Sequence, residues 1–189
     1  MRRRDAIARI LRVNHGGEHG AIAIYRAQLA AARWRCPELT PFLAETLSHE
    51  LEHRRRFRAL MPARNARPCR AMWTWGLGGA ALGAFTGLLG RQAVLICTEA
   101  VERTVHQHLD DQLAFLGGRD PELSRTIREI GEQEQGHLTH AVAERRPKQA
   151  LGRALDAVVS AATEVLIWLS TQGDSARLAR ELAAARRAP

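Results

Sequence analysis

The sequence predicts an all-α fold, and three observations support this prediction. Hydrophobic residues make up 46% of the 189 positions, which is enough for one domain with a sizeable core. Ala, Leu, Arg and Glu favour helices and recur throughout, whereas the β-branched runs typical of strands are missing. Aromatic residues amount to only 5%. We therefore expect one helical domain over residues 1–172, followed by a polar C-terminal tail over residues 173–189.

Prolines and helix-capping residues divide the N-terminal part of the chain. The first helix is expected over about residues 6–35, because Pro37 follows it. Thr40 offers an N-cap with Pro41 at the first helical position, so that a second helix begins here. It ends at a proline-containing loop over residues 62–70.

The C-terminal part of the chain carries the same signals. Asp120 followed by Pro121 repeats the capping pattern and begins a helix that ends near Pro147. A last apolar helix is expected over about residues 148–170. Gly173 then begins the polar tail, which we expect to be frayed.

A hydrophobic segment over residues 71–90 contains no formally charged residue and six glycines. Its length would span a bilayer, and Trp73 and Trp75 lie at one end, as residues of the membrane–water interface do. Three interpretations compete: a spanning helix, a close-packed core hairpin, and a helix lying in the membrane interface. We favour an interfacial hairpin because the chain is rich in arginine, with a core hairpin almost equally supported.

The formal net charge of +8 is carried almost wholly by arginine, since Lys148 is the only lysine. A solvated surface explains much of this charge, but clusters at residues 2–4 and 54–56 could meet nucleic acid or an anionic membrane. No helix-turn-helix, zinc-finger or RNA-binding signature accompanies them. We therefore expect peripheral membrane association and no nucleic acid.

The three cysteines indicate a reducing compartment, because they form no CxxC pair and their number is odd. They are Cys36, Cys69 and Cys97. No apolar secretory signal precedes the first motif. We expect a bacterial protein on the cytoplasmic side.

Two Glu-x-x-His motifs, Glu50 to His53 and Glu134 to His137, are candidates for metal binding. Residues three apart share one face of a helix, so each motif can direct a carboxylate and an imidazole at one point. Steps of seven residues show that each of four glutamates interrupts the apolar stripe of a different helix. These four are Glu18, Glu50, Glu102 and Glu134.

Four buried carboxylates need a counter-charge, because burying even one ionised carboxylate costs several kcal/mol. Two divalent cations supply four positive charges, while the two histidines bind in their neutral form. One Glu from each of two helices and Glu-x-x-His from each of two others form the ligand set of ferritin-like di-metal bundles. Mixed oxygen and imidazole ligation suits iron or manganese.

The alternative is that such residues are solvated and pair with arginine, as we expect for His49, Glu52 and Glu99. This alternative accounts better for any single glutamate or histidine than for all six together. Five further residues are candidates for orienting the ligands, although a surface position is as well supported for the histidines among them. They are His15, His19, Tyr25, His108 and His140.

Four segments carry a resemblance to a known family: LRVNHGGEHGA (11–21), SHELEHRRRF (48–57), CTEAVERTVHQHLDDQ (97–112) and EQEQGHLTHA (132–141). They resemble demethoxyubiquinol hydroxylases, the di-iron monooxygenases of ubiquinone biosynthesis, and the likeness covers nearly the whole chain. The ligands of that family fall on the same six residues, Glu18, Glu50, His53, Glu102, Glu134 and His137.

The resemblance implies a ferritin-like four-helix bundle with an additional C-terminal helix, two iron ions (Fe²⁺), and hydroxylation of a polyprenylated methoxy-methyl-benzoquinol by O2. It also implies a peripheral protein of the bacterial inner membrane, as a homo-oligomer or in complex with other proteins of ubiquinone biosynthesis. Arg103, Leu109 and His19 depart from residues common in the family.

Two other functions remain open from the sequence. One is a ferritin-like ferroxidase or peroxide-handling di-metal protein, although a soluble cage subunit has little use for the hydrophobic segment over residues 71–90. The other is an arginine-rich helical module that binds nucleic acid or anionic lipid and holds no metal.

Overall fold

The described part of the chain consists of α-helices and short 3-10 turns. The computed structural model describes the backbone of residues 3–187 and the side chains of residues 5–180. The helices of this part are α1 (Arg3–Arg35), α2 (Thr40–Leu60), α3 (Met72–Leu89), α4 (Arg91–Leu116), α5 (Pro121–Glu144), α6 (Ala150–Thr171) and α7 (Asp174–Arg187). No strand occurs within residues 3–187, which confirms the predicted all-α fold. The side chains of the arginine cluster at residues 2–4 lie outside the described residues.

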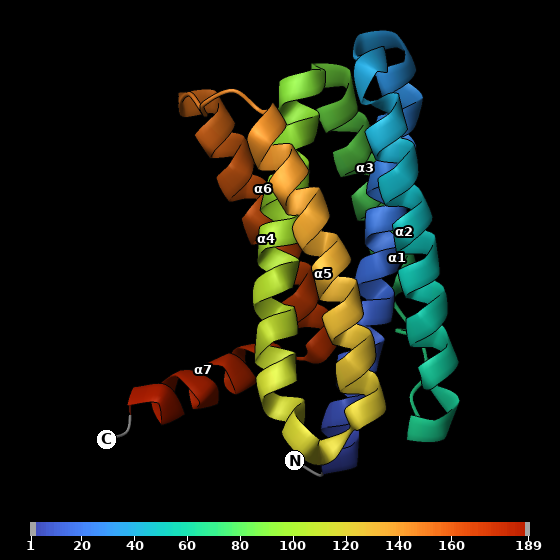
Figure 1. Ribbon diagram of the computed structural model, residues 1–189, viewed down its shortest axis with the longest axis vertical. Coiled ribbons are helices and arrows are strands. Elements are labelled where there is room, and N and C mark those ends of the chain that lie inside the picture. The colour runs from blue at the N-terminus through green and yellow to red at the C-terminus, as the bar shows by residue number, and fades with distance from the viewer. Residues whose placement is uncertain (1–2, 188–189) are drawn as a thin grey trace.

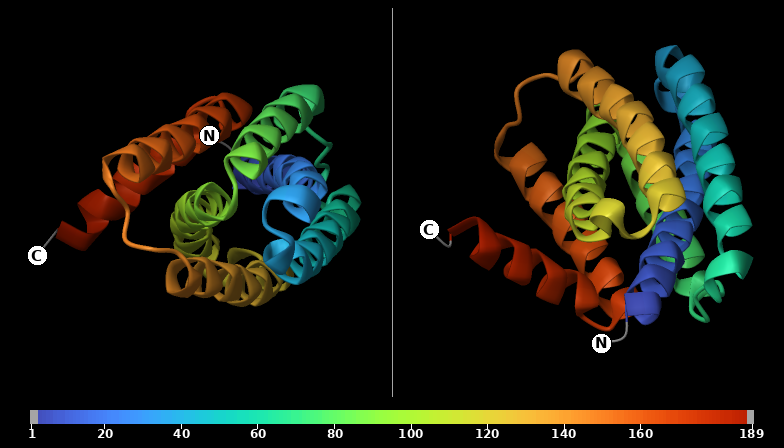
Figure 2. Two further views of the ribbon diagram at one scale, coloured as in Figure 1. Left: turned by 90° about the horizontal axis from the view of Figure 1, so that it is seen from above. Right: turned by 60° about the horizontal axis from the view of Figure 1, so that its bottom comes forward.

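Helices α1, α2, α4 and α5 form an up-and-down four-helix bundle (Figure 1). Viewed from above, α3 and α6 lie on the same side of this bundle, with α3 against α1 and α6 against α4 (Figure 2). The predicted ferritin-like bundle and the additional C-terminal helix α6 are thus confirmed. Helix α7 leaves the bundle sideways at the lower end (Figure 1).

The bundle core has an apolar cluster near each end and a polar layer between them. The lower cluster includes Leu11, Phe57 and Ile127, and the upper cluster includes Tyr25 and Leu43. The four glutamates predicted to interrupt the apolar stripes lie in the layer between these clusters. The two clusters hold the helices rigidly on either side of this layer, so that the polar side chains are fixed in a dry interior.

The hydrophobic segment over residues 71–90 forms one continuous helix, α3, so the predicted hairpin is wrong. Gly79, Gly83 and Gly87 recur every four residues and form a flat face against α1. A Cβ atom at Gly79 or Gly83 would collide with the backbone of α1 at Gly20 or Ile24. The glycines therefore allow two helices to pack backbone to backbone, and the turn that a hairpin would need occurs only at Gly90, where φ is 93°.

The start of α2 and the structure of the C-terminal segment differ from the prediction. Thr40 does not cap α2: it is the first residue of the helix, and its hydroxyl donates to the carbonyl of Pro37 in a preceding 3-10 turn. The segment after Gly173, expected to be a frayed tail, forms the helix α7. Its residues are mostly strong helix formers, and Asp174 favours the helix N-terminus.

The capping signal at Asp120 is confirmed. Its carboxylate accepts a hydrogen bond from the backbone N–H of Leu123 at 3.0 Å and begins α5. Arg64 in the loop after α2 binds the same carboxylate through two hydrogen bonds, at 2.6 and 2.7 Å. This contact fixes the loop over residues 62–70 against the start of α5.

Candidate metal centre

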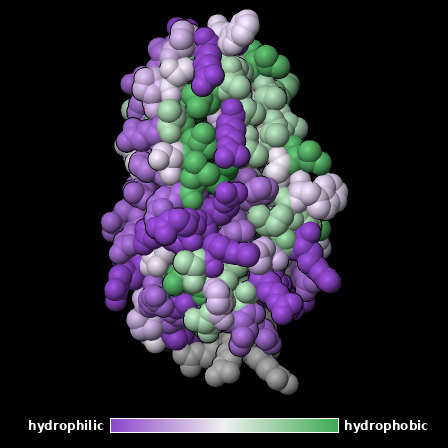
Figure 3. All heavy atoms as spheres, turned by 90° about the vertical axis from the view of Figure 1, so that its right-hand side faces the viewer, coloured by the Kyte–Doolittle hydropathy of each residue, from purple (hydrophilic) through white to green (hydrophobic). Residues whose placement is uncertain are grey.

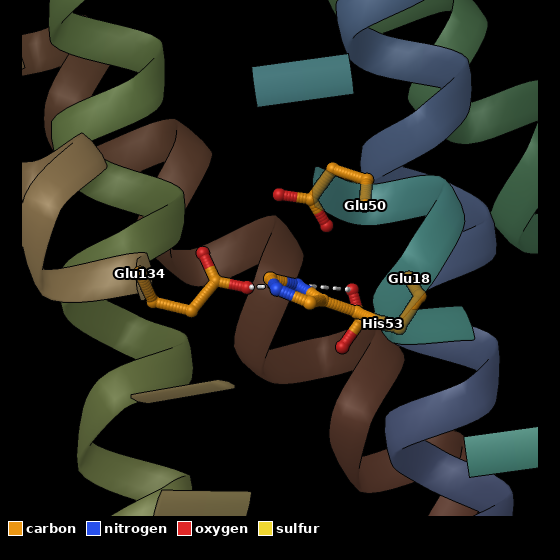
Figure 4. Close-up of side chains that lie close together, drawn as sticks. All are labelled: Glu18, Glu50, His53 and Glu134. Atoms are coloured by element: carbon orange, nitrogen blue, oxygen red, sulfur yellow. Dashed lines mark ion pairs between the residues drawn. The ribbon is translucent and has the colours of Figure 1, made fainter. Parts of the chain in front are cut away.

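All six residues predicted as metal ligands lie in the polar layer of the bundle. Glu18 comes from α1, Glu102 from α4, and the two Glu-x-x-His motifs come from α2 and α5. Each of the six is at most 7% exposed. Figure 4 shows that Glu18, Glu50, His53 and Glu134 point toward one another from three different helices.

The six side chains form two overlapping groups of four. In each group, one candidate ligand atom per residue lies within 4.8 Å of the other three. The first group is Glu18, Glu50, His53 and Glu134, and the second is Glu50, Glu102, Glu134 and His137. Glu50 and Glu134 belong to both groups, so that two cation positions would share these two carboxylates.

The Nδ1 atoms of both histidines face the carboxylates. His53 Nδ1 lies 3.1 Å from Glu134 Oε1, and His137 Nδ1 lies 3.2 Å from Glu134 Oε2. On the other side of each ring, His53 Nε2 lies 2.7 Å from Gln133 Oε1, and His137 Nε2 lies 3.0 Å from His49 Nδ1. An N–H at Nε2 that donates to these partners leaves Nδ1 as the free lone pair that a metal requires.

Gln133 and His49 were not singled out by the sequence as supports for the site, and His49 was expected to be solvated. Each stands directly before the glutamate of one Glu-x-x-His motif and contacts the histidine of the other motif. This exchange depends on how α2 and α5 face each other. The available signal was a polar residue directly before the glutamate of each motif. Its partner can be identified only from the packing of α2 against α5.

Burial dominates the electrostatics of the carboxyl groups. It raises the pKa of Glu18 to about 7, that of Glu102 to about 8 and that of Glu50 well above its ordinary value. For Glu134, burial also acts to raise the pKa, but hydrogen bonds with His137 and His53 outweigh it, and the pKa is lowered.

The histidines respond in the opposite sense. Burial acts to lower their pKa values, but the surrounding carboxylates outweigh it and raise the pKa to about 9 for His53 and about 10 for His137. Without metal, these raised pKa values favour the protonated forms of Glu102 and of both histidines. These protons bring the total charge of the site close to zero, which is also what two divalent cations would do after displacing them.

The side chains present fit a pair of divalent cations. Glu50 Oε1 and His53 Nδ1 are buried, and neither makes a well-directed hydrogen bond among the described residues. The donors are carboxylate oxygens and imidazole nitrogens, which suit iron or manganese, and neither group contains a thiolate. A metal at this point would satisfy atoms that the protein itself leaves unsatisfied.

Three of the candidates for orienting the ligands occupy different surroundings. The Tyr25 hydroxyl donates to Glu102 Oε1 at 2.5 Å and so contacts the site directly. His108 lies 3.1 Å from the carboxylate of Glu164 on α6. His15 makes no hydrogen bond to the carboxylates within the described residues, and it faces Arg54 and Arg58 instead.

The other two candidate histidines lie at the edge of the bundle. The His140 ring stacks on that of Phe42, with 4.0 Å between centroids. Arg54 donates to His19 Nδ1 at 3.0 Å. Neither of these contacts reaches a carboxylate of the site.

An apolar cavity of about 400 Å³ lies against the six-residue site. Its inner end contains Glu18, Glu50, Glu102 and Glu134. Its walls come from α1, α3, α4, α6 and α7, and are mostly apolar side chains such as Ile24, Leu82, Val101, Leu109 and Ile167. A cavity of this size and character is typical of a site for an apolar small molecule.

Ion pairs hold α6 over this cavity. Asp156 on α6 accepts hydrogen bonds from Arg103 at 3.0 Å and from Lys148 at 2.8 Å. Glu99 pairs with Arg103, Arg145 and Lys148; the expected pairing with arginine is confirmed, but the expected solvated position is wrong because Glu99 is buried. Arg103, which departs from the family pattern, thus fastens α6 to α4.

Comparison with known proteins gives consistent matches. The family model described as "Ubiquinone biosynthesis protein COQ7" matches residues 5–170. The "NADPH-dependent 3-demethoxyubiquinone 3-hydroxylase, mitochondrial" of Dictyostelium discoideum is 33% identical over 90% of this chain and 79% of its own length. The protein of the same name from Mus musculus is 35% identical over 88% and 78%. The "3-demethoxyubiquinol 3-hydroxylase" of Rhodospirillum rubrum is 35% identical over 87% and 77%.

Proposed function

Because the chain belongs to the COQ7 family of ubiquinone biosynthesis proteins, we propose that it hydroxylates the ring of a demethoxyubiquinol with O2 at two iron ions. Glu18, Glu50, His53, Glu102, Glu134 and His137 would hold these ions. One observation carries this proposal: a six-residue set of carboxylates and imidazoles borders an apolar cavity in the bundle.

The reaction adds one oxygen atom of O2 to a ring carbon in place of hydrogen. The other oxygen atom leaves as water. Its reduction requires two electrons and two protons from a separate reductant. Iron supplies the redox chemistry with O2 when it is bound. The mitochondrial relatives are named as NADPH-dependent, so NADPH is the reductant to supply in an assay.

The protein's own residues position the ring and exclude water. Val101 and Leu109 on α4 and Ile24 on α1 form apolar walls beside the carboxylates. Asn14 and Gln112 also line the cavity, and their side-chain amides exchange two hydrogen bonds at 2.8 and 2.9 Å. Each amide thereby satisfies a donor and an acceptor of the other. The ring would therefore meet a largely apolar wall beside the carboxylates of the metal centre.

The polyprenyl tail of such a substrate dissolves in lipid, and two helices beside the cavity suit contact with a membrane. Trp73 and Leu77 on α3 are 66% and 65% exposed, and Leu151 on α6 is 83% exposed. Among the described residues, α6 is the one helix long and apolar enough to cross a bilayer, with 17% of its apolar window buried. We propose that α3 and α6 lie in the interface of the inner membrane on its cytoplasmic side, with the cavity opening between them.

Supply of the chain to an extract that lacks quinol hydroxylation tests the function. We expect mass spectrometry to detect a product that is heavier by one oxygen atom, formed by the wild type but not by Glu134→Ala. The matched control is Glu52→Ala, which removes an exposed glutamate paired with Arg55 and should leave turnover unchanged. Rapid iron oxidation without any quinol product would favour the ferroxidase alternative, for which the apolar cavity has no use.

A further inference from the structure

A second cluster of titratable side chains lies between α1, α2 and the start of α3. It consists of His15, His19, Arg54 and Arg58, none of which lines the apolar cavity. We call it the basic cluster. Arg54 Nη1 donates to His19 Nδ1 at 3.0 Å, and a Cβ atom at Gly76 would lie 3.0 Å from His19 Nε2. Three helices therefore converge on these groups.

In the part of the chain whose side chains are described, the basic cluster has no acidic partner for its arginines. Among residues 5–180, neither Arg54 nor Arg58 forms an ion pair with an acidic side chain. Their neighbours on the same helix differ: Arg55 pairs with Glu52 at 2.6 Å, and Arg56 pairs with Glu129. Helix α2 thus presents paired arginines on one side and unpaired arginines, four residues apart, on the other.

His15 is the buried member of the cluster. It is 7% exposed, and its Nδ1 atom has no hydrogen-bond partner within the described part of the chain. Burial, followed by the charges of Arg58, Arg54 and His19, lowers the pKa of His15 to about 4. A buried ring without a partner that faces two guanidinium groups is an arrangement that an anion would stabilise.

We infer that the basic cluster binds a phosphate group. Arg54 and Arg58 would contribute the charge, since each guanidinium carries five N–H donors and only one donor of Arg54 is used by His19. His15 would contribute a buried donor from its unpartnered nitrogen. This site is separate from the metal centre, and it does not depend on the proposed hydroxylation.

The phosphate of an anionic lipid headgroup is the source that the surroundings favour. Trp73, exposed on α3, lies three residues before Gly76, which faces His19, and Leu77 follows directly. On the face of the molecule that carries α2, a band of hydrophilic side chains crosses the middle, with hydrophobic side chains above it (Figure 3). A headgroup in the basic cluster would place its acyl chains along the exposed apolar side of α3.

Vesicle binding of the iron-loaded chain tests this source. The probes are phosphatidylcholine vesicles with and without phosphatidylglycerol, and the key variant is Arg54→Gln/Arg58→Gln. Its control, Arg55→Gln/Arg56→Gln, removes the same charge from the same helix. We expect the first variant to lose about tenfold more affinity for the anionic vesicles than the control does. Arg58→Gln alone serves as a second variant if the double variant fails to fold, because it keeps the contact between Arg54 and His19. We expect it to lose about threefold in affinity for the anionic vesicles.

A second arm distinguishes a soluble phosphate. Inorganic phosphate and NADPH are titrated separately while the imidazole signals of His15 are followed by NMR. Saturable shifts that Arg54→Gln/Arg58→Gln abolishes and the control retains would assign the site to a soluble phosphate. Such shifts, or the selective loss of vesicle binding, support the inference. Equal losses in both double variants, together with no selective shift of His15, would overturn it.

Discussion

Helix α4 buries carboxylates in two regions that are neutralised in different ways. Glu99 is 6% exposed and is surrounded by Arg103, Arg145 and Lys148. Glu102, one turn further on, is 2% exposed and lies among three other glutamates. In the described part of the chain, no arginine or lysine forms an ion pair with any of those four.

This difference separates a structural ion-pair network from a ligand site. The chain contains many arginines and places three basic side chains around Glu99, yet among residues 5–180 no arginine or lysine forms an ion pair with a carboxylate of the six-residue site. Of the basic side chains that the structure describes, His53 and His137 are the two that lie within 4.0 Å of these carboxylates. A buried acidic cluster without an arginine or lysine partner needs cations from solution, or protons in their absence.

Removal of a shared carboxylate should have the largest effect. Glu134 belongs to both groups of candidate ligands, so Glu134→Ala is expected to reduce the iron content from two ions per chain to nearly none and to abolish turnover. Elemental analysis after anaerobic loading measures the first effect. Glu99→Ala provides the comparison, because that carboxylate has its own basic partners and should leave the iron content unchanged. Iron retained in Glu134→Ala would contradict the assignment.

Neutral replacements should change stability in opposite directions in the two regions. In metal-free protein at pH 8, Glu99→Gln is expected to lower the free energy of unfolding by about 2 kcal/mol, because it removes the buried carboxylate that three half-buried basic side chains share. Glu18→Gln should raise it by about 1 kcal/mol, because it removes a charge that burial disfavours. Urea unfolding measures both values. The same sign for both variants would erase the distinction.

Replacing the residues that hold the Nε2 atoms of the histidines should have a smaller effect. We expect it to change the affinity for iron. Gln133→Ala or His49→Ala removes the partner of a histidine Nε2 and should weaken iron binding by about 10- to 100-fold. A competing chelator measures this affinity. Gln135→Ala is a matched control, since Gln135 bonds to Thr139 on the exposed side of the same helix. Equal loss in the control would remove the special role of Gln133.

The dependence of stability on pH should distinguish metal-free from loaded protein. The pKa values of Glu18 and Glu102, about 7 and about 8, and of His53, about 9, all exceed the ordinary values of these groups. Groups with raised pKa values stabilise the fold below their unfolded pKa, and this contribution is lost as the pH rises through the folded value. The Tm of metal-free protein should therefore fall between pH 6 and pH 9, whereas bound cations should suppress the fall. A flat profile after chelation would contradict these shifts.

The residues that sequence analysis could identify are those whose position along one helix determines their environment. Glu18 and Glu102 were found because each interrupts a seven-residue apolar stripe, and the stripe determines which face is buried. His49 and Gln133 were missed because their partners lie on another helix. Which side chains meet there depends on how α2 and α5 are rotated relative to each other.

The hydrophobic segment shows a second limit of the sequence. Its composition indicated an apolar element but could not decide between a hairpin and a helix. Gly79, Gly83 and Gly87 acquire their meaning only against the backbone of α1, where side chains larger than hydrogen would collide. Glycine spacing of four residues was the available signal for a continuous, closely packed helix.

Iron binding measured together with proton release is the decisive test of the metal centre. Calorimetric titration of metal-free chain with Fe²⁺ under anaerobic conditions, in buffers of different ionisation enthalpy, gives both quantities at once. We expect two ions per chain and the release of protons near neutral pH, chiefly from Glu102 and the two histidines. Less than one ion per chain, or binding without proton release, would contradict this expectation.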